Sequence, residues 1–256
     1  MGVPTEMTNG GDPARTLALL WRDEGAIPRR GPRRGLSLDQ VVDAAIAVAD
    51  AEGLAVLSIR RVAQALDTSP MTLYTHVPGK AELLDLMIDS AYARMPRTGT
   101  AGRPWREKLT AVAADNRTLF RDHPWTIAVS TQRPALGPGA LGKYEHELSA
   151  LDGLGLTDVQ MDDCLTYLLL FVHAAARTEH EARVAREATA MTDEQWWAAA
   201  GPVLGRLVGP GEFPLASRVG AAAGAAHGSA YDPEHVYEFG LGRVLDGVAL
   251  VLPRHT

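Results

Sequence analysis

The segment 58–80 limits the possible fold more than any other part of this chain, because it predicts two short helices joined by a tight turn. A serine stands where the first helix should be capped, and apolar residues then recur at helical spacing. We expect that helix to end near Asp67. Ser69 followed by Pro70 should begin the second helix, since proline is well tolerated in a first turn. This second helix should be about two turns long and end at His76.

The outward face of the second helix carries an unusual mixture of side chains. Leu73 and Val77 should point inward, so methionine, threonine, tyrosine and histidine are left facing solvent. A solvated face would normally carry lysine and glutamate, whereas this mixture suits a recognition helix in the major groove of DNA. The alternative is that both helices are ordinary members of an all-α core.

The flanking segments complete a small helical unit. Ser37 and Gln40 form a capping box at the start of a helix that should run to about Glu52, where Gly53 stops it. Gly79 precedes a longer helix with an apolar buried side. This order of helices, with a short turn before the recognition helix, is that of a complete DNA-binding domain.

The motif SIRRVAQAL followed by SPMTLYTHVPGKAELLD resembles the signature of the tetracycline-repressor (TetR) family of bacterial regulators. The resemblance implies an all-α protein with a three-helix helix-turn-helix DNA-binding domain at 36–95. A helical ligand-binding and dimerisation domain should follow at 96–256, and residues 1–35 should form an N-terminal extension. One departure is Asp67, where the family usually has glycine. Aspartate tolerates the left-handed conformation, so we expect a small loss of stability and the same fold.

The motif helices supply the candidate DNA contacts. Arg60, at the end of the first motif helix, should reach a guanine edge, and Met71 should touch thymine methyl groups. Lys80 should hold a phosphate with the help of a helix N-terminus. The residues expected to contact DNA are Arg33, Arg34, Ser58, Arg60, Ser69, Pro70, Met71, Thr72, Tyr74, Thr75, His76 and Lys80.

The N-terminal extension contains a second candidate DNA contact. A short helix is expected over about 13–23, with Leu17, Leu20 and Trp21 on one side. Four arginines at 29–34 lie beside glycine and proline, a composition typical of an arm that enters a minor groove. The alternative is a solvated linker that touches phosphates at most.

The net charge of −6 is unusual for a DNA-binding protein until it is divided along the chain. Residues 29–80 contain seven Lys or Arg and five Asp or Glu, which gives +2 and leaves −8 for the remainder. A mildly basic head on an acidic body favours one mode of approach to DNA. Cys164 is the single cysteine, and no secretory or membrane-spanning pattern is found, so a cytoplasmic location is expected.

Beyond residue 100 the patterns are helical throughout. Helices are expected at about 105–122, from Pro124, at about 140–153, at about 158–188, around Trp196 and Trp197, and from 233 to about 252. The middle of 158–188 is apolar nearly all round, which is typical of a helix buried on several sides. The glycine, alanine and proline content of 209–229 indicates a long mobile connection.

Gly240 and Gly247 stand seven residues apart in the last helix. Each should cost about 1 kcal/mol relative to alanine, so their expected use is to let another helix come close. The family resemblance implies that the helices at 158–188 and 234–252 pair with their counterparts in a second subunit as a four-helix bundle. The alternative is that these helices pack within one chain.

Three patterns that would indicate an enzyme or a metal site are weak. Residues 137–142 match G-x-G-x-x-G, but that motif needs a β-α-β unit, which the sequence does not predict. His173, Glu179 and His180 could form a metal site, but the two histidines are seven residues apart and have no clear third ligand. Cys164 lies in an apolar helix that should raise its pKa, which disfavours a nucleophile. We therefore expect no catalytic residue, metal or cofactor.

The family resemblance implies a cavity among the C-terminal helices, whose occupant moves the DNA-binding heads. Its lining is expected to come from Phe120, Trp125, Tyr144, Leu148, Cys164, Tyr167, Leu168, Phe171 and Trp196, and core packing is the alternative role for each. The metal-binding histidine of the tetracycline repressor is not matched, since Val129 and Ser130 stand at that place. Pro96 replaces another drug-contacting histidine, so a magnesium-chelated tetracycline is disfavoured.

The sequence as a whole indicates a homodimeric, ligand-responsive repressor that a small apolar or aromatic molecule releases from a palindromic operator. Two alternatives belong to other classes, a constitutive DNA-binding regulator without an inducer and a helical enzyme. A tightly filled cavity would favour the first alternative, and catalytic geometry would favour the second.

Overall fold

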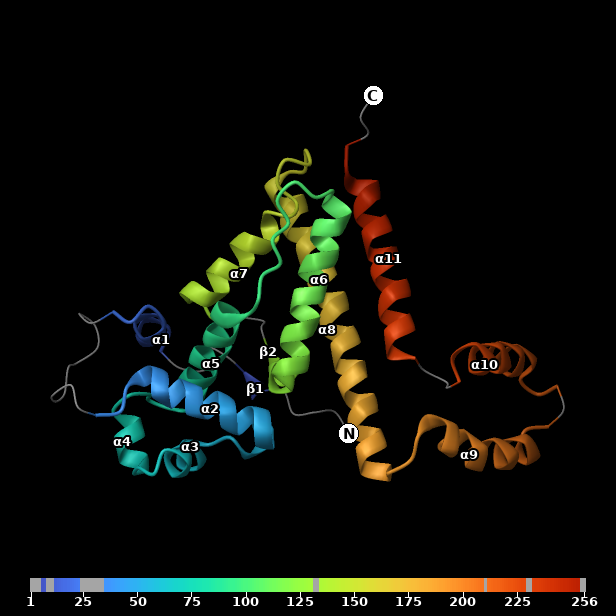
Figure 1. Ribbon diagram of the computed structural model, residues 1–256, viewed down its shortest axis with the longest axis horizontal. Helices are drawn as coiled ribbons and strands as arrows, with labels where there is room; N and C mark the ends of the chain where they lie inside the picture. Colours follow the sequence, from blue (N-terminus) through green and yellow to red (C-terminus); the bar gives the residue numbers. More distant parts are fainter. Residues whose placement is uncertain are drawn as a thin grey trace.

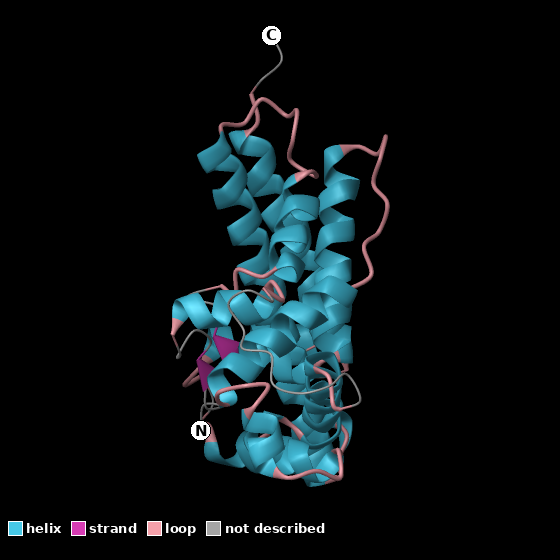
Figure 2. Ribbon diagram, turned by 90° about the vertical axis from the view of Figure 1, so that its left-hand side faces the viewer, coloured by secondary structure: helices cyan, strands magenta, loops and turns pink. Residues whose placement is uncertain are grey.

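The computed structural model describes residues 6–7, 12–23, 35–130, 134–209, 211–228 and 232–253. Within these residues the fold is helical apart from one parallel pairing of two-residue strands, β1 (Glu6–Met7) with β2 (Val129–Ser130). Figure 2 shows this strand pair beside a body made of helices. The prediction of an all-α protein is confirmed.

Eleven α-helices and two 3₁₀ helices follow one another along the described residues. They are α1 (Pro13–Leu20), α2 (Leu38–Glu52), η1 (Leu54–Val56), α3 (Ile59–Ala65), α4 (Pro70–Tyr74), α5 (Lys80–Arg94), α6 (Trp105–Asp122), η2 (Pro124–Ala128), α7 (Pro138–Leu148), α8 (Asp158–Thr189), α9 (Asp193–Leu207), α10 (Pro214–His227) and α11 (Pro233–Val251). The boundaries of α2, α6, α8 and α11 lie within about one residue of those predicted. Helix α4 ends at Tyr74, two residues before the predicted His76, and Thr75 forms its C-terminal cap.

Helices α2 to α5, here called the N-terminal unit, share one apolar core. Leu73 of α4 and the following Val77 are fully buried, as predicted. The capping box of α2 is also confirmed, since the Ser37 hydroxyl accepts from the Gln40 backbone and the Gln40 side chain accepts from the Ser37 backbone. Helix α4 is thus held by a single buried leucine, and most of its surface faces outward.

The turn between α3 and α4 has the left-handed geometry predicted at Asp67, whose φ is +48°. The Thr68 N–H donates to the Ala63 carbonyl at 3.0 Å, and the Asp67 N–H donates to the Gln64 carbonyl at 3.2 Å. This pair of bonds is a Schellman motif, which normally has glycine at the left-handed position. Aspartate therefore keeps the turn that orients α4.

Helices α6, α8 and α11 lie side by side and, with α7, form the C-terminal unit (Figure 1). Their shared core is drawn from all three helices, with Leu109 from α6, Leu168 from α8 and Leu245 from α11 among its members. Helix α8 is buried on one side only, because Tyr167 is 56% exposed and Leu170 is 64% exposed. The expectation that α8 is buried on several sides is thus not met within one chain.

The last helix also differs from its predicted role. A side chain added at Gly240 would lie 2.4 Å from the Phe171 ring of α8, so this glycine admits a neighbour in its own chain. The apolar residues Tyr237, Leu241 and Val248 are likewise buried within the chain. Gly247 is different, since nothing lies within 4 Å of an added Cβ there. The close approach predicted at Gly240 is therefore between α8 and α11 of the same chain.

The two units meet where α7 packs on α5. A Cβ at Gly139 would lie 2.0 Å from the backbone oxygen of Asp89, and one at Gly137 would lie 2.4 Å from the Asp89 side chain. The Asp89 carboxylate accepts from the Ala140 N–H at 2.8 Å. The glycines that resembled a nucleotide-binding motif thus let the first turn of α7 contact α5, as small residues permit close approach.

The segment that was predicted to be a mobile connection contains helix α10. Alanine is frequent over 214–227, and its helix propensity offsets the cost of Gly220 and Gly224. Helices α9 and α10 bury none of their residues in this chain, and Figure 1 shows both extending away from the body beyond α8. Trp196, Leu207 and Leu215 are exposed on them. The two helices form an apolar arm.

Helix α1 is shorter than the predicted 13–23. Leu20 is buried, whereas Leu17 is 37% exposed and Trp21 is 52% exposed. Because α1 ends at Leu20, Trp21 leaves the apolar side of the helix and donates its indole N–H to the Leu136 carbonyl at 2.9 Å. The predicted side therefore splits into one core residue and two partly exposed residues.

Candidate functional site

The outer surface of α4 is built from polar and apolar side chains that have no core to fill. Met71 is 72% exposed and Tyr74 is 47% exposed. The Ser69 hydroxyl caps α4 by accepting from the Thr72 N–H, and the Thr75 hydroxyl donates to the Thr72 carbonyl at 2.6 Å. These local bonds fix α4 without covering its outer surface.

The structure places most of the predicted DNA contacts on one stretch of the N-terminal unit. Exposed positions are Ser58, Arg60, Ser69, Pro70, Met71, Tyr74 and Thr75, and partly exposed positions are Thr72, His76 and Lys80. Arg60 lies in the first turn of α3, not at the helix end that leads into α4. Arg33, Arg34 and the rest of the predicted arm lie outside the described residues.

Two features fix the charge and orientation of this surface. Arg61 of α3 forms an ion pair with Glu52 at the end of α2, which holds α3 against the unit. Burial lowers the pKa of His76, so its imidazole is neutral at physiological pH. A neutral imidazole carries one N–H donor, which suits a hydrogen bond to a phosphate oxygen.

The predicted ligand-contacting residues do not gather around one cavity. Leu148, Cys164, Leu168 and Phe171 belong to the core of the C-terminal unit, Trp125 belongs to the core of the N-terminal unit, and Tyr144, Tyr167 and Trp196 are exposed. Of the nine, Phe120 lines the cavity of about 200 Å³ described below. Sequence patterns distinguish apolar from polar faces, but a lining residue and a core residue share the same pattern.

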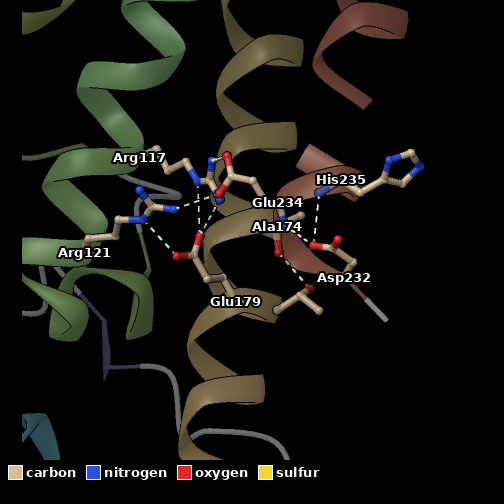
Figure 3. Close-up of polar contacts among 8 residues, drawn as sticks. Arg117, Arg121, Ala174, Glu179, Asp232, Glu234 and His235 are labelled. Atoms are coloured by element: carbon tan, nitrogen blue, oxygen red, sulfur yellow. Dashed lines mark hydrogen bonds and ion pairs between the residues drawn. The ribbon is translucent and has the colours of Figure 1, made fainter. Parts of the chain in front are cut away.

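An ionic cluster centred on the buried Arg117 joins the three long helices of the C-terminal unit. Figure 3 shows Arg117 and Arg121 of α6 pointing toward Glu179 of α8 and Glu234 of α11. Arg117 is 5% exposed and donates to Glu179 at 3.0 Å and to Glu234 at 2.7 Å. Its guanidinium also lies 3.9 Å above the ring of Tyr237, an arrangement favoured by the ring quadrupole. Hydrogen bonding to Arg117 holds the pKa of Glu234 below its usual range.

A cavity of about 200 Å³ opens beside this cluster, between α6, η2 and the second half of α8. Its lining consists of Phe120, Arg121, Ile127, Ala176, Glu179, His180, Arg183 and Arg186. The apolar members lie on α6, η2 and α8, whereas the charged members lie on α6 and α8. The cavity can therefore contact an apolar group and a negative group of one molecule.

A second polar cluster is enclosed between α5, α6 and α7. The Asn116 amide donates to Glu147 at 2.6 Å, and the Lys143 ammonium donates to the same carboxylate at 2.8 Å. Glu147 is only 2% exposed. Lys143 also lies 5.2 Å from the centre of the Tyr92 ring, whose hydroxyl pKa is raised by burial. This cluster ties α7 to α5 and α6 through satisfied polar groups.

The short helix η2 joins the cavity to the N-terminal unit. Ile127 lines the cavity, and its carbonyl accepts from the His173 ring at 3.1 Å. Two residues earlier, the Trp125 indole donates to the Asp50 carboxylate of α2 at 2.8 Å, and His123 also contacts Asp50 at 2.8 Å. A change in the cavity can thus reach α2 through one short segment.

The side chains considered as a nucleophile or as metal ligands have other environments and partners in the structure. Burial raises the pKa of Cys164, which disfavours a thiolate nucleophile. His180 accepts from Arg183, and His173 donates to a backbone carbonyl, so both have other partners. Across the described ranges, no group of three His, Cys, Asp or Glu is arranged to hold a metal ion. In the same residues, no helix has the length and apolar character needed to cross a membrane.

Sequence reasoning missed Arg117 and Glu234, and it considered Glu179 only as a possible metal ligand. The sequence offered one sign of this cluster, because Arg117 stands next to the residues that form the buried side of α6. Its partners stand 62 and 117 residues away along the chain, so no local spacing connects them.

Family models match two parts of the chain. The model described as "Bacterial regulatory proteins, tetR family" matches residues 41–87, and the one described as "Tetracyclin repressor-like, C-terminal domain" matches residues 96–252. The second match alone covers more than half of the chain.

Individual relatives agree with these models. The chain is 40% identical over 249 residues to the HTH-type transcriptional repressor DrrR1 of Streptomyces coeruleorubidus, covering 97% of this chain and 90% of the relative. It is 39% identical over 91 residues to the class E tetracycline repressor of Escherichia coli, covering 34% of this chain and 43% of the relative. Among solved structures, Streptomyces coelicolor ActR in complex with actinorhodin has a TM-score of 0.70 at 27% identity, covering 86% of this chain and 99% of ActR.

Proposed function

Because the chain belongs to the tetracycline-repressor family, we propose that it is a ligand-responsive transcriptional repressor that binds a palindromic operator as a homodimer. Members of this family are regulators, not enzymes; they bind operator DNA and act as dimers with small-molecule effectors. As a DNA-binding regulator, it would act in the cytoplasm. The proposed division is a DNA-binding domain at 36–95 and a ligand-binding and dimerisation domain at 96–256, preceded by an extension at 1–35.

The outward surface of α4 is the observation that supports DNA binding most strongly. Met71 and Tyr74 stand exposed on a helix whose only buried residue is Leu73. In the proposed complex α4 lies in the major groove, where Met71 contacts thymine methyl groups and Arg60 contacts a guanine edge. Lys80 contacts a phosphate at the N-terminus of α5. Arg33 and Arg34 of the extension are proposed to approach the adjacent minor groove.

The exposed sides of α8 and α11 support the proposed dimer. Tyr167 and Leu170 form an apolar stripe on α8, on the side opposite its buried residues. Phe239 and Leu250 are exposed on α11, at 60% and 86%. Two such stripes from each subunit would bury one another in a four-helix bundle. The interface is therefore proposed at about 158–188 and 234–252, and Gly247 is proposed to take part in it because a Cβ there would meet nothing in its own chain.

The effector is proposed to be a small, largely apolar aromatic molecule. Solved complexes of ActR contain actinorhodin and, in another crystal, (S)-DNPA. In this chain, the cavity beside Phe120 and Ile127 adjoins η2, which contacts α2 through Trp125. An occupant that favours one position of η2 would shift the N-terminal unit, and release of DNA requires such a difference in affinity between two states.

Selection of binding sites from a random duplex library tests this function. The purified full-length protein should enrich one two-fold symmetric sequence, with half-sites about one helical turn apart or a multiple of it. A variant that lacks the exposed α4 side chains, Met71→Ala with Tyr74→Ala, should enrich nothing although it remains folded by circular dichroism. A lack of enrichment by the natural protein would contradict DNA recognition, and an asymmetric sequence would contradict binding as a symmetric dimer.

A further inference from the structure

The cavity between α6, η2 and α8 has an excess of positive charge that its own carboxylate does not offset. Arg121, Arg183 and Arg186 line it together with one acid, Glu179. Glu179 is already occupied, since it accepts from Arg121 at 2.8 Å and from Arg117 at 3.0 Å. The charges of Arg121 and Glu179 thus largely cancel, and the remaining positive charge comes from the second half of α8.

Arg183 and Arg186 supply that remaining positive charge. In the part of the chain that the structure describes, neither has a carboxylate within ion-pair distance. The Arg183 guanidinium donates to the His180 ring at 2.9 Å, and Arg186 donates to the Ala182 carbonyl at 3.3 Å. Burial and then the charge of Arg183 lower the pKa of His180, which keeps that ring a neutral acceptor. Arg177 of the same helix differs, because it pairs with Glu181.

The rest of the cavity lining is apolar apart from His180. Phe120 of α6, Ile127 of η2 and Ala176 of α8 form it, and the Phe120 ring packs in a T-shaped arrangement with the His173 ring, with 5.3 Å between the ring centres. A volume of about 200 Å³ lies below the range of about 300–1,000 Å³ typical of drug-sized ligands. The space therefore fits a planar group of one or two rings.

We propose that this cavity binds an aromatic carboxylate, whose ring lies against Phe120 and Ile127 and whose carboxylate is held by Arg183 and Arg186. Guanidinium groups bind a carboxylate through two parallel N–H bonds, which gives both strength and orientation. This inference rests on the proposed function, because it names the class of effector for the same regulator. It replaces a purely apolar effector with an acid.

The experiment uses 2-naphthoate as the probe and 2-naphthamide, which has the same rings and no charge, as its matched neutral analogue. Isothermal titration of the DNA-free, full-length protein should show that naphthoate binds and that naphthamide binds at least tenfold more weakly. Arg183→Gln with Arg186→Gln should weaken naphthoate at least tenfold and leave naphthamide unchanged. Arg177→Gln removes a charge from the same helix outside the cavity and should leave both affinities within twofold.

Several results would overturn the proposal. These are no binding of naphthoate at millimolar concentration, equal affinity for both probes, or a double variant that binds naphthoate as the natural protein does. An equal loss in Arg177→Gln would also overturn it, because the effect would then come from the net charge of α8. Thermal unfolding of each variant identifies a loss caused by misfolding, in which case Arg183→Lys with Arg186→Lys is measured instead. Lysine keeps the positive charge but lacks the planar pair of N–H donors of arginine. The lysine variant should therefore weaken naphthoate binding less than the glutamine variant does.

Operator binding separates this proposal from the function on which it rests. Fluorescence anisotropy of the selected operator duplex is measured on the same protein samples. Normal operator binding without naphthoate binding overturns the anion site alone. Naphthoate binding without any operator recognition overturns the repressor function and leaves a carboxylate-binding protein.

Discussion

The Trp125 indole of η2 donates to the Asp50 carboxylate at the end of α2 across a distance of 2.8 Å. Trp125 is only 3% exposed, so its N–H has lost water and depends on this acceptor. The residue therefore belongs to the junction between the two units, although it was predicted to line the ligand cavity.

Removing this acceptor should destabilise the protein. Asp50→Ala leaves the Trp125 N–H buried without a partner, which should cost about 1–3 kcal/mol in the free energy of unfolding. Urea unfolding measures the loss. Asp43→Ala, on the same helix, removes a carboxylate whose partner Arg94 is itself more than half exposed, so it should cost less than about 1 kcal/mol. Equal losses in the two variants would show that the contact with Trp125 contributes nothing specific.

Arg60 and Lys80 should affect DNA binding in different ways. Arg60→Ala should lose about 1–3 kcal/mol at one base position and relax specificity there. Lys80→Ala should weaken all sequences alike and flatten the dependence of affinity on salt, because phosphate contacts are independent of sequence. Anisotropy titrations on the operator and on random DNA at several salt concentrations distinguish the two. If Arg60→Ala weakens both DNAs equally, Arg60 contacts the backbone.

The two glycines of α11 provide a matched pair of variants. Gly240→Leu should clash with the Phe171 ring and destabilise each subunit by about 1–3 kcal/mol, as overpacking generally does. Gly247→Leu meets nothing within its own chain, so each subunit should stay folded while dimerisation weakens. Sedimentation velocity and thermal unfolding are measured on both. A stable dimer in Gly247→Leu would place the subunit contact elsewhere.

The ionic cluster predicts unequal effects for its two arginines. Arg117→Leu removes the buried guanidinium and its charged hydrogen bonds to Glu179 and Glu234, which should cost about 1–3 kcal/mol because both carboxylates can still reach water. Arg121→Ala should cost less than about 1 kcal/mol, because its side chain is 49% exposed and its ion pairs are screened. Urea unfolding of both variants checks this order. Comparable costs would mean that the burial of Arg117 does not determine its contribution.

Asp89 should make stability depend on pH. Burial raises the pKa of this carboxyl, and the N–H groups of Ala140 and Gly139 only partly oppose the shift. A pKa raised by folding means that the native state holds the proton more tightly, so this stabilising contribution is present below the unfolded pKa and is lost as pH rises through the folded pKa. Asp89→Asn should remove that fall. Urea unfolding between about pH 4 and pH 7 should show the natural protein losing stability relative to Asp89→Asn as pH rises, and parallel profiles would refute the assignment.

Local signals were enough to predict the DNA-binding half. The Ser37 and Gln40 box, the Asp67 turn and the Ser69 to Pro70 restart each act over a few residues, and each was found where the sequence placed it. Caps and turns can be read from sequence because their hydrogen bonds join near neighbours. Fold class and family were therefore predictable from a short segment.

The C-terminal half depends on contacts that sequence spacing does not encode. Gly240 admits a helix, but only the structure shows that the helix is α8 of the same chain. The partners of Arg117 come from α8 and α11, far along the sequence. Residues 214–227 have a composition that suits either a linker or an alanine-rich helix, and helix propensity prevails. The roles of the residues predicted to contact DNA and the ligand remain predictions.

The close contact of Gly139 with the Asp89 carbonyl is a point about which α5 can pivot. Asp89 is the tenth residue of α5, so about 14 Å of helix separates it from Lys80 beside the recognition helix. Each degree by which α5 pivots about that contact displaces its N-terminal end by roughly a quarter of an ångström. A hydrogen bond to a base edge weakens steeply with misalignment. A tilt of only a few degrees in each subunit would therefore change the spacing between the two recognition helices, so that it no longer matches one helical turn of DNA.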